Sequence, residues 1–158
     1  MTRAPMTFRI ELYCDGSGEE QVERPGGWAF AIVRDGELLH EGHGAEEKTT
    51  SLIMELEAVR AGLEAVIARG LVGDVTVVSD CRIALEVAAG TFRPKPEKYH
   101  ALCDTLRAAA VRASAKTKWI RGHAGHPLNE HVDARAHEAK LEGVARRAAR
   151  KSRRRAKR

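Results

Sequence analysis

Apolar and polar residues alternate along three short segments in the first third of the chain, which is the pattern of half-buried β-strands. The segments are residues 8–14, 28–34 and 37–44. Asp35-Gly36 separates the second segment from the third, and this dipeptide suits a two-residue hairpin turn. The pattern therefore predicts an antiparallel meander of three strands.

The rest of the chain switches to helical spacing with two further strands. Residues 51–69 carry an apolar stripe of helical period that stops at Gly70, and the β-branched run 75–79 is typical of a strand buried on both faces. Helices are predicted at 83–89, at 99–115 and after Pro127, and a short strand at 117–121. The predicted order of elements is β-β-β-α-β-α-α-β-α.

This order indicates an α/β fold in which a mixed sheet of five strands is flanked by helices. Three antiparallel strands come first, and the later strands are added in parallel. In such sheets, functional groups gather at the carboxyl ends of the strands. Asp15 and Asp80 are predicted to lie at two of these ends, and Glu55 lies in the first two turns of the helix at 51–69.

The chain has 158 residues, which suits one domain, and its charge is distributed unevenly. Nine of the 27 Lys and Arg residues lie in residues 146–158, which contain no acid. Residues 1–145 therefore carry 18 basic and 22 acidic groups, a net charge of −4. We expect a folded domain over 1–145 and a basic, disordered tail over 146–158, because dense like charges repel one another. Such a tail either binds nucleic-acid phosphates or is simply solvated.

The cysteines and the N-terminus bear on the compartment. Cys14, Cys81 and Cys103 are odd in number, widely spaced and without a CxxC pair, which argues against a disulfide framework or a zinc site. The first residues lack the apolar run of a signal peptide, and no segment approaches the length of a membrane span. We expect a cytoplasmic protein without membrane contact, and a monomer.

Four carboxylates stand at compatible places along the predicted elements: Asp15, Glu55, Asp80 and Asp133. If they converge, their repulsion implies bound hard cations, and we expect Mg²⁺ held by oxygen ligands. Two such ions close together can activate a water and stabilise a leaving oxygen in phosphodiester cleavage. Each acid alone has an ordinary alternative, since Asp15 also suits a turn and Glu55 a solvated helix face.

The segment WIRGHAGHPLNEHVD, from Trp119 to Asp133, places a histidine on a loop rich in helix breakers and a carboxylate just inside the following helix. Asn129 offers a side-chain oxygen as the cap of that helix, which would put Asp133 about one turn in. By itself the segment is equally compatible with a surface loop that carries incidental histidines.

These residues carry a resemblance to type 1 ribonuclease H of the bacterial type. The matching motifs are CDGSG, TTSLIMELEAV, VVSDCR and WIRGHAGHPLNEHVD, in the order of the family and over about residues 8–141. The last motif is highly specific, MEL is moderately so, and the other two are loose. The resemblance implies the ribonuclease H-like fold.

The resemblance also implies endonucleolytic cleavage of the RNA strand of an RNA/DNA hybrid, leaving a 3′-hydroxyl and a 5′-phosphate. The four metal-ligand acids of the family fall on Asp15, Glu55, Asp80 and Asp133, for two ions of Mg²⁺, or of Mn²⁺. The mobile-loop histidine of the family, which assists proton transfer or product release, falls on His123. A histidine suits that task because it titrates near the working pH.

Substrate contacts are implied for a further set of positions. Thr50 matches the phosphate-pocket threonine of the family, Asn129 the asparagine of the last motif, and Arg82 falls where the family has a glutamine. Ser51 and Leu52 stand where bacterial members commonly have two polar amides, which weakens the usual minor-groove hydrogen bonding.

The long basic protrusion of many members is absent, since only GTFRPKPEK lies between Ala89 and Tyr99. We expect the basic tail to compensate by binding the phosphates of the hybrid.

Two alternatives use the same fold. A non-catalytic nucleic-acid-binding module would be expected to lack one of the acids or the histidine, and all are present. Another nuclease of this fold, such as a junction resolvase or a 3′ exonuclease, would be expected to have a different final motif. The leading hypothesis is a metal-dependent hybrid ribonuclease.

Overall fold

A five-stranded mixed sheet is the centre of the computed structural model, which describes residues 7–20 and 23–158. The spatial order is β3-β2-β1-β4-β5, with β1 antiparallel to β2, β2 antiparallel to β3, and β4 and β5 added in parallel. The strands are β1 (Phe8–Ser17), β2 (Arg24–Arg34), β3 (Glu37–Thr49), β4 (Gly73–Ser79) and β5 (Lys116–Trp119). The predicted α/β fold and order of elements are confirmed.

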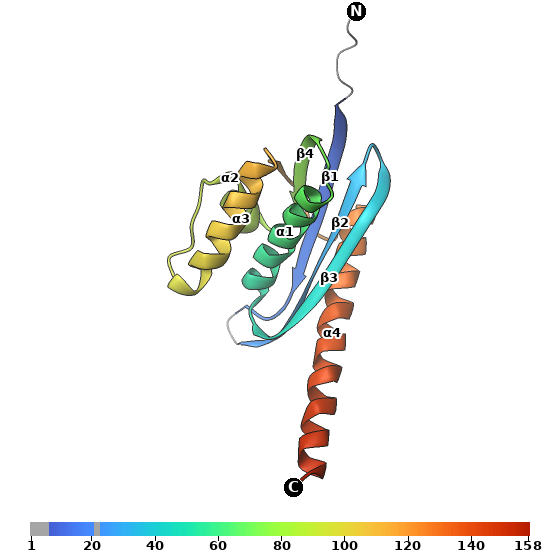
Figure 1. Cartoon of the computed structure of the whole chain (residues 1–158), viewed down its shortest axis with the longest axis vertical. Helices are drawn as coiled ribbons and strands as arrows, with labels where there is room; N and C mark the ends of the chain where they lie inside the picture. Colours follow the sequence, from blue (N-terminus) through green and yellow to red (C-terminus); the bar gives the residue numbers. More distant parts are fainter. Residues whose placement is uncertain (1–6, 21–22) are drawn as a thin grey trace, which may run out of the picture.

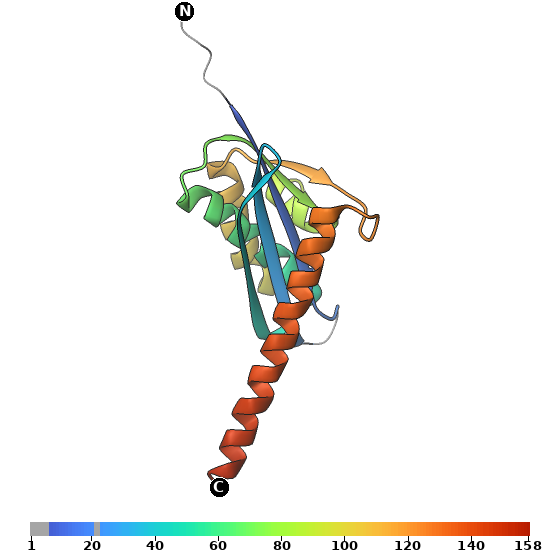
Figure 2. The same ribbon diagram turned by 90° about the vertical axis from the view of Figure 1, so that its right-hand side faces the viewer.

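Helices cover both faces of this sheet (Figures 1 and 2). Three lie on one face and one long helix crosses the other. They are α1 (Ser51–Ala68), α2 (Arg82–Ala89), α3 (His100–Arg112), which follows a 3₁₀ turn η1 (Glu97–Tyr99), and α4 (Pro127–Ala156).

Alternation along the central strands produces two hydrophobic cores, because successive side chains of a strand point to opposite faces. Leu12 and Val77 belong to the larger core under α1, α2 and α3, whereas Tyr13 and Val78 belong to the smaller core under α4. The smaller core is thin because α4 lies directly on β2. A Cβ atom on Gly27 would be 2.3 Å from the carbonyl oxygen of Ala136, so only glycine permits this approach.

Three local details differ from the sequence predictions. β1 continues to Ser17, so Asp15 lies inside the strand, paired with Ala29 of β2, rather than at its end. The parallel ladder with β4 stops at Tyr13, however, so Asp15 still lies beyond the last residue that β4 supports. The short strand before the histidine loop covers Lys116–Trp119, slightly earlier than predicted.

The start of α4 corrects the predicted cap. His126 is the N-cap residue and Pro127 begins the helix, so Asn129 lies within the first turn and does not cap it. Proline suits this first position because its missing N–H would be unpaired there in any case. Asp133 is consequently the seventh residue of α4, nearly two turns in rather than one.

The basic tail is helical, contrary to the predicted disorder, because α4 runs without interruption to Ala156. Alanine, arginine and lysine have high helix propensity, and Arg150 forms an ion pair with Glu47 of β3. Figure 2 shows the last turns of α4 projecting beyond the sheet. No break marks the domain boundary predicted at residue 145, which stays a prediction.

Cys14, Cys81 and Cys103 are free thiols. Among the described residues, no helix is both long and apolar enough to cross a membrane. The prediction that the N-terminus lacks a signal peptide rests in part on residues 1–6, which lie outside the described ranges.

Candidate metal centre

Three carboxylates from three different elements meet beyond the carboxyl end of β4. Asp15 comes from β1, Glu55 from the second turn of α1, and Asp80 directly follows β4. One carboxylate oxygen from each lies within 4.8 Å of the other two. The sequence prediction that these acids converge therefore agrees with the geometry.

The close approach of α1 to β1 brings Asp15 and Glu55 together. A Cβ atom on Gly16 would be 2.4 Å from the amide nitrogen of Glu55, so β1 and the helix touch at backbone level. Thr50 caps α1, with its hydroxyl accepting a hydrogen bond from the amide of Ile53 at 3.3 Å. This cap sets where the helix begins and therefore where Glu55 points.

Two residues of α4 complete the surroundings of the carboxylates. Asp133 lies close enough to Asp15 to raise the pKa of that carboxyl, and Asn129 lies close enough to Asp80 to lower the pKa of its carboxyl. Asn129, in the first turn of α4, is 2% exposed. Its role in the structure is therefore to contact an acid of the cluster rather than to cap the helix.

The electrostatics of the cluster favour protonation when no cation balances it. Burial, followed by the charge of Asp80, raises the pKa of Asp15 to about 8. Burial and the neighbouring Asp15 raise the pKa of Glu55 well above its usual range. Burial also raises the pKa of Asp80, against the lowering effects of Asn129 and the nearby His123. Like charges held this close are costly, so the arrangement favours a bound counter-charge.

The donor set fits a hard divalent cation. All the grouped ligand atoms are carboxylate oxygens, which Mg²⁺ and Mn²⁺ prefer to nitrogen or sulfur. Glu55 Oε2 is buried and has no hydrogen-bond partner in the structure, so this oxygen of the cluster is free to bind a cation. Asp15, Glu55 and Asp80 are therefore the residues that could hold a metal ion, with Asp133 beside them.

The loop before α4 brings His123 near the cluster. His123 is exposed and has a backbone φ of 53°, a left-handed conformation that few residues with a Cβ adopt. Its neighbour Gly122 lies against Asp80, where a Cβ atom would be 2.7 Å from Oδ2. The glycine thus allows the loop to run directly past the carboxylate.

Arg82 and Trp119 form a platform beside Asp80. The guanidinium of Arg82 stacks over the Trp119 ring at 3.8 Å from its centroid, and the indole N–H donates to the backbone carbonyl of Asp80 at 2.9 Å. Sequence reasoning identified Arg82 but not Trp119. The available signal was a tryptophan that ends the otherwise polar run Lys116–Trp119, because aromatics outside a core often mark binding surfaces; in the structure it is 41% exposed.

Of the substrate-contact residues that the sequence indicated, Thr50 and Ser51 lie at the start of α1. Thr50 is 2% exposed, and the amide of Ser51 donates to the carbonyl of Glu19 at 2.9 Å.

The sequence analysis missed His126, whose ring is 5.3 Å from that of Tyr13 and whose buried Nδ1 has no partner.

A family model and several known proteins match most of the chain. The family model described as RNase H matches residues 8–140. A ribonuclease H of Phenylobacterium zucineum is 34% identical over 91% of this chain and 98% of its own length. A ribonuclease HI of Caulobacter vibrioides is 35% identical over 84% of this chain and 93% of its own.

Solved structures share the fold. The N-terminal RNase H domain of a Mycobacterium tuberculosis protein superposes with a TM-score of 0.76 at 19% identity, over 88% of this chain and 98% of its own. LC11-RNase H1, solved in complex with an RNA/DNA hybrid, gives a TM-score of 0.73 at 20% identity, over 85% and 99%.

Proposed function

Because this chain belongs to the RNase H family, we propose that it is an endonuclease that hydrolyses the RNA strand of RNA/DNA hybrids with the aid of divalent metal. One observation carries the proposal, namely the convergence of Asp15, Glu55 and Asp80 from three separate elements. A set of buried acids that favours protonation is poorly suited to a purely structural role. It is well suited to a cation that would stabilise the ionised carboxylates.

Asp15, Glu55, Asp80 and Asp133 would hold the metal, which we propose to be two ions of Mg²⁺, with Mn²⁺ able to replace it. Ions at such a site supply a nucleophilic water and charge stabilisation at the scissile phosphate. The contribution of the chain is to fix the carboxylate oxygens on β1, α1, β4 and α4 before the substrate arrives. Asn129 lies beside Asp80 and lowers the pKa of that carboxyl, so we propose that it is a positioning residue.

His123 is proposed to move a proton during cleavage or product release. It lies close enough to Asp80 to lower the pKa of that carboxylate, yet its own side chain is exposed to incoming substrate. An imidazole can accept a proton from water or donate one to a departing oxygen.

The proposed partner is an RNA/DNA hybrid duplex, which the protein would bind through the phosphates and 2′-hydroxyls of the hybrid. Thr50 and Ser51, at the start of α1, would contact the sugar-phosphate backbone of the hybrid. Arg82 is exposed and would contact a phosphate. Part of the basic segment 146–158 is proposed to add affinity for nucleic acid. The chain is further proposed to act as a monomer, because the four acids all come from one chain. It is also proposed to be cytoplasmic.

A cleavage assay tests the proposal. Labelled RNA/DNA hybrid, double-stranded RNA and double-stranded DNA are each incubated with the protein in Mg²⁺, in Mn²⁺ and in EDTA. We expect cleavage of the RNA strand of the hybrid alone, dependent on metal, and a fall of at least about 10³-fold for Asp15→Asn.

Glu64→Gln is the matched control. Glu64 is on the same helix as Glu55 but faces Arg112 at 3.9 Å on the surface, so its loss is expected to leave cleavage unchanged. Absence of hybrid cleavage by the wild type, or its persistence in Asp15→Asn, would contradict the proposed function.

A further inference from the structure

The face of α4 that carries Asp133 to the metal centre continues as a row of basic side chains. Lys140, Arg147 and Lys151 follow Asp133 at intervals of seven, seven and four residues. At 3.6 residues per turn, all three fall within about 40° of Asp133 around the helix axis. The same side of the helix therefore presents an acid at the site and cations beyond it.

These cations line a hollow between α4 and the start of β2. Lys140, Arg147 and Lys151 form one wall, and Arg24 at the start of β2 contributes a fourth cation from the opposite wall. Glu19 is the acid of this hollow. In the described ranges, none of the four cations forms an ion pair, so their charge is available to a ligand.

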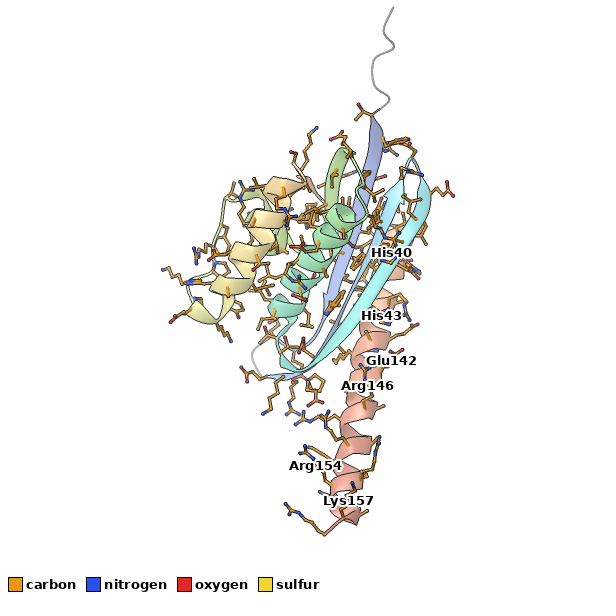
Figure 3. All side chains as sticks on the ribbon, viewed as in Figure 1. His40, His43, Glu142, Arg146, Arg154 and Lys157 are labelled. Carbon is orange, nitrogen blue, oxygen red and sulfur yellow. The ribbon has the colours of Figure 1, made fainter. Side chains whose placement is uncertain are left out.

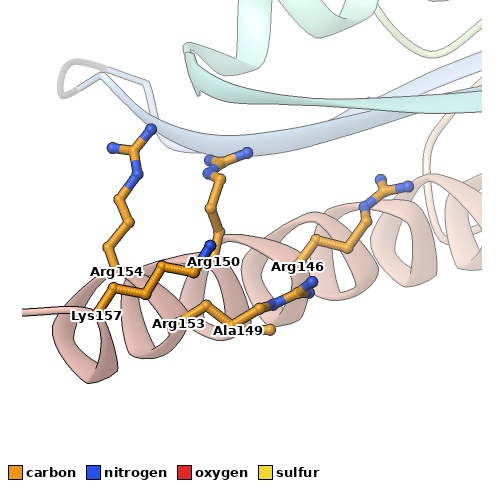
Figure 4. A pocket seen from close by; sticks show the side chains of 6 residues that line it. All are labelled: Arg146, Ala149, Arg150, Arg153, Arg154 and Lys157. Atoms are coloured by element: carbon orange, nitrogen blue, oxygen red, sulfur yellow. The ribbon is translucent and has the colours of Figure 1, made fainter.

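A second set of cations on α4 is turned further around the helix axis. Arg150 is paired with Glu47 of β3. Figure 4 shows it in a second hollow that lies entirely on α4 and is lined by Arg146, Ala149, Arg150, Arg153, Arg154 and Lys157. Arg153 and Lys157 lie about 120–160° around the helix from Asp133, so they face away from the metal centre. Figure 3 shows Lys157 near the far end of α4.

We propose that the hybrid duplex extends from the metal centre along the first hollow, with Arg24, Lys140, Arg147 and Lys151 contacting its phosphate backbone. This inference rests on the proposed function. It identifies the surface that binds the part of the hybrid lying beyond the metal centre. It also narrows the contribution of the basic segment to one face of α4.

The dimensions agree with a duplex. With a rise of 1.5 Å per residue, Lys140 lies about 10 Å and Lys151 about 27 Å along the helix from Asp133. A strand with one phosphate about every 3.4 Å covers that span in about eight nucleotides. Short hybrids would therefore occupy the metal centre without reaching Arg147 and Lys151, whereas long hybrids would reach both.

A pair of charge-matched double variants tests the inference. Arg147→Gln with Lys151→Gln removes two cations from the proposed groove, and Arg153→Gln with Lys157→Gln removes one arginine and one lysine from the other side. The affinity for a 20-base-pair hybrid is measured by anisotropy in EDTA across a salt series, and kcat and KM are measured in Mg²⁺.

We expect the groove variant to raise Kd and KM about tenfold with unchanged kcat, and to reduce the salt slope by about 2. The control variant is expected to change KM less than twofold and to keep the slope. With a six-base-pair hybrid the groove variant and the wild type should coincide. Equal melting temperatures for the two variants verify that both are folded.

Equal effects of the two variants would overturn the inference, because the cations would then act only through net charge. So would an unchanged Kd and slope in the groove variant, or an equal loss on the short hybrid. These results are distinguishable from failure of the proposed function, which would appear as absence of hybrid cleavage by the wild type in Mg²⁺.

Discussion

Gly16 packs against Glu55 so closely that a Cβ atom on the glycine would be 2.4 Å from the Glu55 amide nitrogen and 2.5 Å from the Met54 carbonyl carbon. The contact joins β1 to the first turns of α1. It therefore sets the separation between the carboxylates of Asp15 and Glu55. Backbone atoms of a helix cannot move aside as a flexible side chain can.

Gly16→Ala should therefore push α1 away from β1. We expect a loss of about 2 kcal/mol in unfolding free energy and of most of the cleavage activity. Urea denaturation and the cleavage assay measure the two effects. Ser17→Ala, the next residue of the strand, serves as the control for stability, and a Gly16→Ala protein with wild-type activity would show that the contact does not position the site.

The raised pKa of Asp15 predicts a pH dependence for the metal-free protein. The unfolded chain loses this proton near the ordinary value of 3.8, whereas the native protein holds it to about pH 8. Between these values the native state binds more protons, so stability falls as pH rises. In EDTA we expect Asp15→Asn to be more stable than the wild type at pH 8, by on the order of 2 kcal/mol, and to match it near pH 4.

Divalent metal should reverse this order at pH 8. Mg²⁺ stabilises the ionised carboxylates of the wild type, so its melting temperature should rise with metal concentration, and the rise should shrink toward pH 5 as protons compete. Asp15→Asn should show a much smaller rise. Thermal melts with Mg²⁺ and with EDTA decide this, and an equal metal response in both proteins would argue against Asp15 as a ligand.

His123→Asn tests the loop histidine while preserving its backbone, because asparagine tolerates the left-handed conformation at φ 53°. We expect kcat to fall about 100-fold, as for loss of a proton-transfer group. Stabilisation by Mg²⁺ should be unchanged. His137→Asn, at an exposed position of α4, is the control, and a loss of metal-induced stabilisation in His123→Asn would indicate a role in holding the ion instead.

Arg82→Ala removes the cation that stacks on Trp119 beside Asp80. If Arg82 contacts a substrate phosphate, KM should rise about threefold to tenfold while kcat stays within about twofold. Arg112→Ala removes a surface arginine at the end of α3 and serves as the control. A fall in kcat without a change in KM would show that Arg82 acts through Asp80 rather than on the substrate.

The sequence alone determined the order of the elements and the positions of the acids along them. The apolar stripe of α1, the β-branched run of β4 and the breaker-rich loop around His123 are local patterns, and local patterns decide secondary structure when packing agrees with them. The element boundaries made the convergence of Asp15, Glu55 and Asp80 compatible with the fold, and the family resemblance implied it. That prediction required no knowledge of individual contacts.

Only the tertiary structure decided how the site is held. Asn129 is a partner of Asp80 rather than a helix cap, Trp119 hydrogen-bonds to the backbone of Asp80, and the basic segment is the end of α4 rather than a disordered tail. Each depends on groups that are distant in sequence or on a helix register set by packing, as Gly27 and Ala136 set that of α4. A local pattern specifies a residue's element, but which neighbour that residue contacts is determined when the elements pack.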